Sequence, residues 1–87
     1  MSEESVLEFP CKFPIKMMGR DTPEFRALAR ALVEKHAGAV ANSAVQAATS
    51  RNGRFVSVTV TITATSQQQL DDIYRDVSSK DDVLMAL

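Results

Sequence analysis

The feature that most constrains the fold is an unbroken alternation of side chains from Phe55 to Thr65. One parity is aliphatic, and the other consists of Phe55 followed by serine and threonine. The aliphatic positions are Val56, Val58, Val60, Ile62 and Ala64. Because successive side chains of a strand point to opposite faces of a sheet, this pattern predicts a long strand with one buried and one solvated face. The chain must therefore build a sheet and cover only one side of it.

The rest of the chain predicts helices and strands in alternation. We expect a first strand over residues 11–19, a first helix between Pro23 and Gly38, a less regular second strand over 39–49, a second helix after Ser66 and a fourth strand over 83–87. Asn52-Gly53 readily takes the positive φ angles of a tight turn, and so predicts a hairpin before the long strand. In the fourth strand, Val83, Met85 and Leu87 share one parity.

Both predicted helices begin with residues suited to a helix start. Asp21 or Thr22 can act as the first N-cap, because a side-chain oxygen there can accept a free amide of the first turn, and Pro23 suits the first helical position. Ser66 can cap the second helix, with Gln69 completing a capping box. These signals fix where each helix starts.

The element order βαββαβ favours an α+β, ferredoxin-like sandwich, in which two helices cover one face of a four-stranded antiparallel sheet. The first and third strands are then neighbours in the middle of the sheet. Pro14 cannot donate a ladder hydrogen bond, so the first strand should lie at an edge or be bulged there. The face without helices is predicted to carry Lys16, Met18, Phe55, Ser57 and Thr59.

Length and charge limit the classes of protein. The chain has 87 residues, which is the size of one small domain. We expect residues 1–6 to form a flexible acidic tail and residues 7–87 to form that domain. The net charge of −1 argues against nucleic-acid binding, because a basic excess supplies most of the non-specific affinity for phosphate backbones.

Cysteine content and hydropathy indicate the compartment. Cys11 is the single cysteine, so an intramolecular disulfide and a thiolate metal cluster are excluded. The N-terminal residues lack the pattern of a secretory signal, and no segment has the run of apolar residues that a membrane span needs. We therefore expect a soluble, cytoplasmic protein.

The sequence does not predict an enzyme, a metal site or a cofactor. No nucleophile, base and orienting group can be assembled by spacing. His36 lies on the apolar side of the first helix, where packing or capping is expected, and Cys11 is expected to be a small, partly buried residue. Asp71-Asp72 and Asp81-Asp82 are adjacent pairs whose side chains diverge, which indicates solvated charge.

Three stretches resemble the YbeD-like family of small bacterial proteins. They are "LEFPCKFPIKMMG" (7–19), "SRNGRFVSVTVTITAT" (50–65) and the closing "DDVLMAL". The resemblance runs from Leu7 to Leu87 and implies a ferredoxin-like fold similar to ACT regulatory domains, with no established biochemical activity. It also implies a link to lipoate metabolism, because family members are often encoded beside lipoate-attachment genes.

The segment "GRDTPEF" is similar to the first strand-to-helix turn of amino-acid-binding ACT domains. That similarity implies a ligand site at Gly19, Arg20, Asp21 and Thr22, where amides at a helix start can hold a carboxylate. Glu24 occupies the position of the second glycine of the ACT pattern, and its side chain and charge oppose such a ligand. The alternative is that these residues only end a strand and start a helix.

The predicted uncovered face suggests a different function. Lys16, beside a row of hydroxyl side chains, could bind an anion or an acidic partner, or could only keep an exposed sheet soluble. RNA-recognition domains share this element order and stack bases on aromatic residues, but the first strand offers no outward aromatic side chain. The leading hypothesis is a non-enzymatic regulatory or adaptor domain that acts through an unidentified protein partner or as a homo-oligomer. A small-molecule sensor is the alternative.

Overall fold

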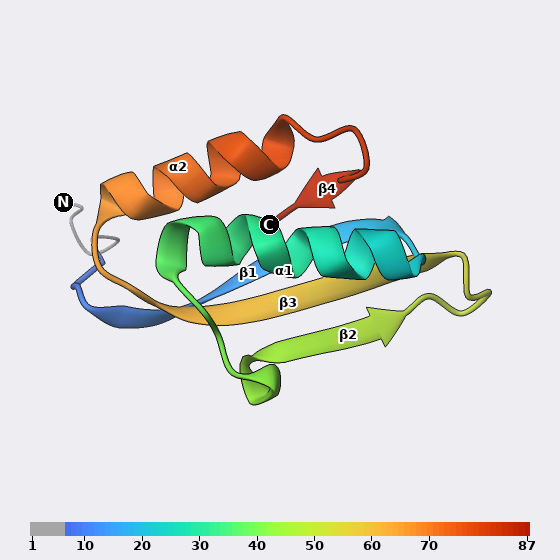
Figure 1. Cartoon of the computed structure of the whole chain (residues 1–87), viewed down its shortest axis with the longest axis horizontal. Helices are drawn as coiled ribbons and strands as arrows, with labels where there is room; N and C mark the ends of the chain where they lie inside the picture. The colour runs from blue at the N-terminus through green and yellow to red at the C-terminus, as the bar shows by residue number, and fades with distance from the viewer. Residues whose placement is uncertain (1–6) are drawn as a thin grey trace, which may run out of the picture.

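The computed structural model describes residues 7–87, so the predicted tail at residues 1–6 lies outside the described residues. Figure 1 shows the elements in chain order. They are β1 (Cys11–Arg20), α1 (Pro23–Ala37), the short 3-10 helix η2 (Asn42–Ala44), β2 (Val45–Thr49), β3 (Phe55–Ala64), α2 (Gln67–Ser78) and β4 (Met85–Ala86). The predicted order βαββαβ is confirmed.

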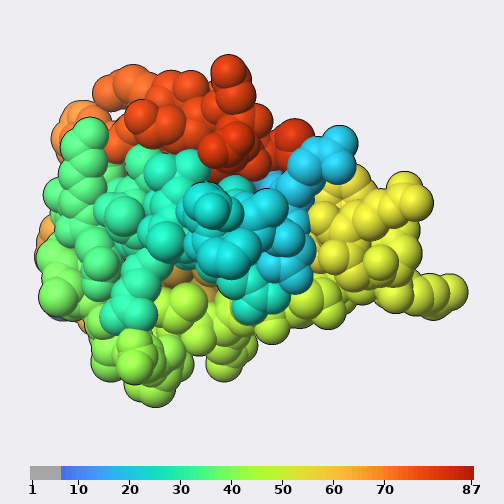
Figure 2. Space-filling model, turned by 45° about the vertical axis from the view of Figure 1, so that its right-hand side comes forward, coloured from blue at the N-terminus to red at the C-terminus, as the bar shows by residue number. Residues whose placement is uncertain are grey.

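The four strands form one antiparallel sheet in the order β2-β3-β1-β4. β1 and β3 pair along their whole length, from Cys11 opposite Ala64 to Arg20 opposite Phe55. Both helices lie against the same face of this sheet (Figure 1). In the space-filling view the helices cover that face, and the loop between β2 and β3 projects beyond them (Figure 2). The fold is the predicted α+β, ferredoxin-like sandwich.

The core lies between the sheet and the two helices. It combines the aliphatic parity of β3 with alternate residues of β1 and the inner sides of both helices. Its members are Ile15, Met17, Phe25, Ala29, Leu32, Val33, Val56, Val58, Val60, Ile62, Ala64, Leu70, Ile73 and Val77. No buried side-chain nitrogen or oxygen of the described residues lacks a hydrogen-bond partner. The alternation of β3 therefore follows from having helices on one side only.

Side-chain caps start both long helices. The Thr22 hydroxyl accepts a hydrogen bond from the Phe25 amide at 3.0 Å, and the Ser66 hydroxyl accepts one from the Gln69 amide at 3.1 Å. The predicted capping box at Ser66 is wrong in one detail. The Gln69 side-chain oxygen accepts the amide of Thr65, at 2.8 Å, and not the amide of the N-cap residue Ser66 that a capping box would use.

The predicted second strand over 39–49 is too long, since β2 begins only at Val45. Side chains of α1 bind the backbone of the preceding segment. The Arg30 guanidinium donates to the Val40 carbonyl at 2.6 Å and to the Asn42 side-chain oxygen at 2.7 Å, and the Glu34 carboxylate accepts the Val40 amide at 3.0 Å. The polar groups of Val40 are therefore used by the helix and are not available to a sheet ladder.

The predicted fourth strand over 83–87 is also too long, because β4 spans only Met85–Ala86. Val83 lies before the strand and packs against the core, so it does not share the face of Met85. Hydrogen bonds of Leu87, the residue after β4, nevertheless hold this end of the chain against β1 and α2. Leu87 exchanges backbone hydrogen bonds with Lys16 at 2.8 and 3.2 Å, and the Tyr74 hydroxyl donates to the Leu87 carbonyl at 2.8 Å.

The predictions for two other strand ends are off by one residue: β1 continues past Gly19 to Arg20, and β3 stops at Ala64 instead of Thr65. Pro14 lies in β1 where β4 does not reach, because β4 pairs only with Met17 and Met18. Lys16 directs its amide toward Leu87 at this edge, and Pro14 shares the parity of Lys16. The prediction that this strand lies at an edge or is bulged at Pro14 is therefore wrong, because β1 is an inner strand with an unbroken register to β3. Proline is tolerated there because its missing donor faces the side of β1 that β4 does not reach.

Candidate functional site

The turn between β1 and α1 is the first of two candidate sites. Thr22 is the N-cap and Pro23 the first helical residue, so Thr22 takes the role that the sequence left open between it and Asp21. Asp21 instead forms a bidentate pair with Arg26, with distances of 2.8 and 2.9 Å. Hydrogen bonding to the guanidinium lowers the pKa of the Asp21 carboxyl below its ordinary value. Asp21 is therefore engaged within the turn.

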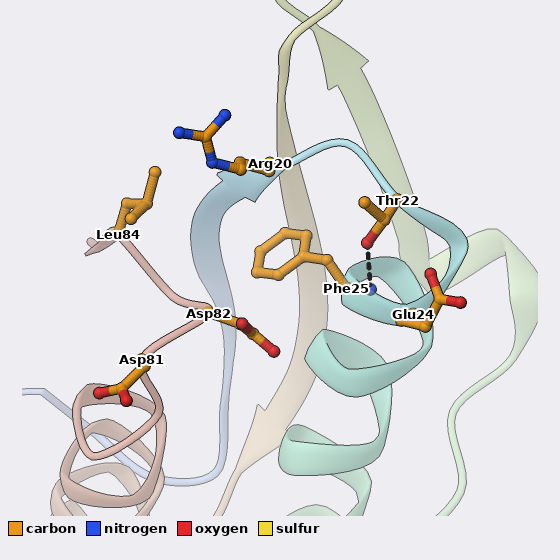
Figure 3. A pocket seen from close by; sticks show the side chains of 7 residues that line it. All are labelled: Arg20, Thr22, Glu24, Phe25, Asp81, Asp82 and Leu84. Carbon is orange, nitrogen blue, oxygen red and sulfur yellow. Dashed lines mark hydrogen bonds between the residues drawn. The ribbon is translucent and has the colours of Figure 1, made fainter.

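A pocket of about 310 Å³ opens beside this turn, between the start of α1 and the segment that joins α2 to β4 (Figure 3). It is lined by Arg20, Thr22, Glu24, Phe25, Asp81, Asp82 and Leu84. In Figure 3 the Phe25 ring lies at the centre of this group, whereas the side chains of Arg20, Leu84, Glu24 and Asp81 point away from it. The pocket thus has an aromatic floor and charged residues around it.

Two of the four residues predicted for a ligand site at this turn line the pocket, namely Arg20 and Thr22. Gly19 is buried behind Phe25, and Asp21 is paired with Arg26. Three carboxylates, on Glu24, Asp81 and Asp82, surround the pocket and would repel a carboxylate ligand. Asp81 and Asp82 come from the other end of the chain, and no sequence pattern indicated that they would meet this turn.

The cap at Thr22 gives a testable prediction. Replacing Thr22 by alanine removes the acceptor of the Phe25 amide, so we expect the free energy of unfolding to fall by about 0.5–2 kcal/mol. Serine at the same position keeps the hydroxyl and should restore most of the loss. Urea denaturation of the two variants measures the difference. Equal stabilities of the alanine and serine variants would contradict the capping role.

The second candidate site is the sheet face that the helices leave uncovered, here called the open sheet face. Strand register places on it alternate residues of all four strands. They are Lys12, Pro14, Lys16, Met18 and Arg20 of β1, Gln46 and Ala48 of β2, Phe55, Ser57, Thr59, Thr61 and Thr63 of β3, and Met85 of β4. All five residues predicted for this face from the sequence are among them.

The register brings these predicted residues together in pairs. Lys16 lies opposite Thr59, and Met18 lies opposite Ser57 on one side and Met85 on the other. Met85 is 51% exposed, and Leu87, which pairs with Lys16 through its backbone, is 63% exposed. Met18 and Met85 therefore form an apolar pair, with Leu87 nearby, toward the hairpin end of a face that no helix covers.

A hollow of about 270 Å³ lies at the end of the open sheet face nearest the hairpin. Met18, Ala48, Phe55 and Ser57 line it, together with Thr49, Ser50 and Val56. The Arg20 guanidinium lies over the Phe55 ring, with its carbon 5.8 Å from the ring centroid, which is a cation–π distance. The hollow is mainly apolar and has a cation at its border.

The sequence interpretation missed Arg20, Gln46, Ala48 and Met85 as members of the open sheet face. Arg20 was missed because the first strand was expected to end at Gly19, although the alternation continues for one more residue. Gln46 and Ala48 were missed because the second strand had no clear parity. Met85 was placed on its own strand but could not be assigned to a face without the register to β1.

A tie between the two helices was also missed. The His36 ring nitrogen Nε2 lies 2.9 Å from the Asp76 carboxylate, and Lys35 and Lys80 approach the same carboxylate at 3.1 and 3.9 Å. Hydrogen bonds from His36, and then from Lys35, lower the pKa of the Asp76 carboxyl below its ordinary value of 3.8. His36 thus fastens α1 to α2, forty residues away in sequence.

This tie predicts a pH dependence of stability. Because the folded state lowers the pKa of Asp76, the ionised carboxylate stabilises the fold above pH 3.8, and the contribution is lost as the pH falls through the folded-state pKa. Asp76→Asn should therefore be less stable than the parent chain at pH 7 and nearly equal to it in strong acid. Urea denaturation at both pH values measures this, and a constant difference would contradict it.

Residues 7–87 contain neither a metal-ligand cluster nor a membrane-spanning helix. In that range no three histidine, cysteine or acidic side chains are grouped as a metal ion would require. No helix of the described part combines the length and the apolar character needed to cross a membrane.

The fold and the open sheet face define a small ferredoxin-like α+β domain. The family described as "Protein of unknown function (DUF493)" matches residues 4–87, and the chain belongs to this family. The family has no known biochemical function, so neither a catalytic nor a binding role comes with membership. The resemblance to YbeD-like proteins that the sequence indicated is confirmed.

Relatives agree with this assignment, and a solved structure shares the fold. A UPF0250 protein of Paraburkholderia phytofirmans is 47% identical over 72 residues, covering 83% of this chain and 81% of that protein. The UPF0250 protein NE1487 of Nitrosomonas europaea is 39% identical over the full length of both chains. The solution structure of protein HP0495 from H. pylori superposes with a TM-score of 0.73 at 18% identity, covering 99% of this chain and 90% of that one, which shows the shared fold.

Proposed function

We propose that this chain is a non-enzymatic regulatory or adaptor domain that binds another protein on its open sheet face. The observation that carries the proposal is an apolar cluster on the side of the sheet without helices. It consists of the partly exposed Met18 and the exposed Met85 and Leu87. Exposed apolar clusters with a polar border are typical of protein interaction surfaces. Here the border consists of Lys16 and the hydroxyl groups of Ser57 and Thr59.

An open sheet face suits a protein partner better than a substrate. Catalysis needs groups that converge on a reacting atom, whereas the side chains of a sheet face stand side by side. The partner covers the face that has no helices, and so removes the apolar cluster from solvent. Because the family resemblance implies a link to lipoate attachment, lipoate-attachment enzymes are the first candidate partners. The compartment that we propose for this interaction is the cytoplasm.

Affinity capture tests this proposal with matched variants. Tagged parent chain, a Lys16→Glu, Phe55→Ala double variant and an Arg75→Glu control are used to capture proteins from an extract of cells that make this protein. Lys16 and Arg75 are both exposed cations, but Arg75 lies on α2, in the helical layer. We expect the same partner with the parent and the control, and none with the double variant.

Two results would overturn this function. One is a partner retained by the double variant and lost by Arg75→Glu, because binding would then use the helical layer. The other is sedimentation that shows a homo-oligomer whose assembly is abolished by the double variant, because a second copy would then occupy the open sheet face. Repeating the capture with the purified partner separates direct binding from binding through a third protein.

The pocket beside the β1–α1 turn supports a second candidate function, a small-molecule sensor. Its volume of about 310 Å³ suits a small ligand, its Phe25 ring offers one apolar contact, and its carboxylates favour a cationic group over an anionic one. Thermal denaturation with a panel of amino acids and the corresponding amines tests this. A bound ligand raises the melting temperature, and no shift at millimolar concentration would exclude the sensor.

A further inference from the structure

Charge is distributed unequally between the two layers of the sandwich. Each of the five cations in or beside α1 and α2 lies 2.8 to 3.9 Å from a carboxylate. The pairs are Arg26–Asp21, Arg30–Glu34, Lys35–Asp76, Arg75–Asp72 and Lys80–Asp76. The positive charge of the helical layer is thus neutralised locally, and Glu24, Asp71, Asp81 and Asp82 add negative charge to the same half of the molecule.

The sheet layer has the opposite character. Lys12, Lys16 and Arg20 project from β1 on the open sheet face, and Arg51 and Arg54 are exposed in the hairpin between β2 and β3. Within β1 to β4 as described here, no acidic residue shares this face, and no carboxylate of residues 7–87 pairs with these five cations. The net charge of −1 is therefore the sum of a basic open sheet face and an acidic helical layer.

We propose that the open sheet face binds an acidic, extended segment of the partner protein, with one aliphatic side chain of that segment in the hollow next to Met18 and Phe55. This inference rests on the proposed function and adds the chemistry of the partner. A partner covering the face would leave three cations of β1 without solvent, so it must supply carboxylates to compensate them. The hollow of about 270 Å³ supplies the apolar part of the contact.

The spacing along β1 defines the pattern of the segment. Lys12, Lys16 and Arg20 are each four residues apart, which is about 13 Å in a strand with a rise of about 3.3 Å per residue. An extended segment that lies along β1 meets them with an acidic side chain at every fourth residue. The serine and threonine hydroxyls of β3 can donate further hydrogen bonds to these carboxylates.

A protein segment accounts for the face better than a nucleic acid does. Sheet-face recognition of single strands depends on aromatic side chains on which bases stack. Phe55 is the single aromatic residue of the open sheet face within residues 7–87, and the Arg20 guanidinium already lies over its ring. Met18 and Met85 form an apolar pair that suits an aliphatic side chain and offers no partner to a base.

Two synthetic peptides of equal length test this inference. One has three glutamates, at every fourth position, and a leucine midway between the two glutamates that would face Lys16 and Arg20, because Met18 lies midway between these cations. The other is identical except for glutamine in place of each glutamate. A single-stranded RNA and a second copy of the chain provide the competing occupants. Fluorescence anisotropy at low and at physiological salt measures the peptides and the RNA, and sedimentation measures self-association. Lys16→Glu is the test variant and Arg75→Glu the matched control.

We expect the glutamate peptide to bind at least about tenfold more tightly than the glutamine peptide, with the difference reduced by salt and by Lys16→Glu but not by Arg75→Glu. Equal binding of the two peptides, binding of neither, or tighter binding of the RNA would overturn the acidic segment. A dimer that covers the face would overturn it as well. Equal binding of the two peptides, or binding of neither, would leave the proposed capture of a protein partner by the open sheet face intact. The acidic-segment proposal and the proposed function can therefore be rejected independently.

Discussion

Replacing Ile73 by alanine is expected to lower the free energy of unfolding by about 2–5 kcal/mol. Ile73 is fully buried in the middle of α2, within the single core that the helices share with the sheet. Alanine leaves a cavity there that the surrounding side chains can fill only in part. For a domain of this size the total stability is about 4–13 kcal/mol, so the variant should be partly unfolded at modest urea concentrations.

Urea denaturation followed by circular dichroism measures this loss. Ile73→Val removes a single methylene and should cost about 0.5–1.5 kcal/mol, so it remains measurable if the alanine variant does not fold. Gln68→Ala, at an exposed position of the same helix, is the control and should change the stability by less than about 0.5 kcal/mol. A loss at Ile73 no larger than that at Gln68 would show that α2 does not pack on the sheet as described.

Replacing Gly19 by alanine is expected to lower the free energy of unfolding by about 1–3 kcal/mol, because there is no room for a Cβ atom. A Cβ built at Gly19 would lie 2.5 Å from a ring carbon of Phe25 and 2.6 Å from the backbone oxygen of Asp82. The Phe25 ring can move slightly, but the backbone of Asp82 is held in the segment that leads to β4. Gly19 is therefore required for close packing and not for a turn.

Lys12→Ala is the control for this prediction, because Lys12 is exposed on the same strand. Denaturation curves of the two variants should differ by at least about 1 kcal/mol. Curves that coincide would mean that Phe25 and the α2–β4 segment do not press on β1 at this point. Coinciding curves would also mean that Gly19 does not pack between Phe25 and Asp82, two residues that line the pocket beside the turn.

Much of the fold could be predicted because β3 obeys a simple rule. Its period of two indicated which face is buried, and the element order placed β1 and β3 side by side in the middle of the sheet. The residue-by-residue register between these strands is known only from the structure. The extent of β2 could not be predicted in this way. Arg30 and Glu34 bind the backbone of Val40, which is ten and six residues further along the chain. This contact can be seen only once α1 has been placed in the structure.

The candidate site was predictable to the same degree as the strands that form it. The parities of β1 and β3 placed Lys16, Met18 and Phe55 on one face. The contribution of β4 was not predictable, because a two-residue strand has too few positions to show a period. The segregation of charge also needed the structure, since the pairs that neutralise the helical cations include Lys35–Asp76, which joins α1 to α2.

Site-specific photo-crosslinking in cells tests the central claim, that the open sheet face is the surface that binds a partner. A photoreactive amino acid replaces Gln46 on that face, Gln68 on the outer side of α2, or Glu24 at the pocket beside the turn; all three positions are exposed. We predict a discrete crosslinked partner from position 46 and none from positions 68 and 24. Crosslinks from position 68 or 24, with none from position 46, would contradict the account.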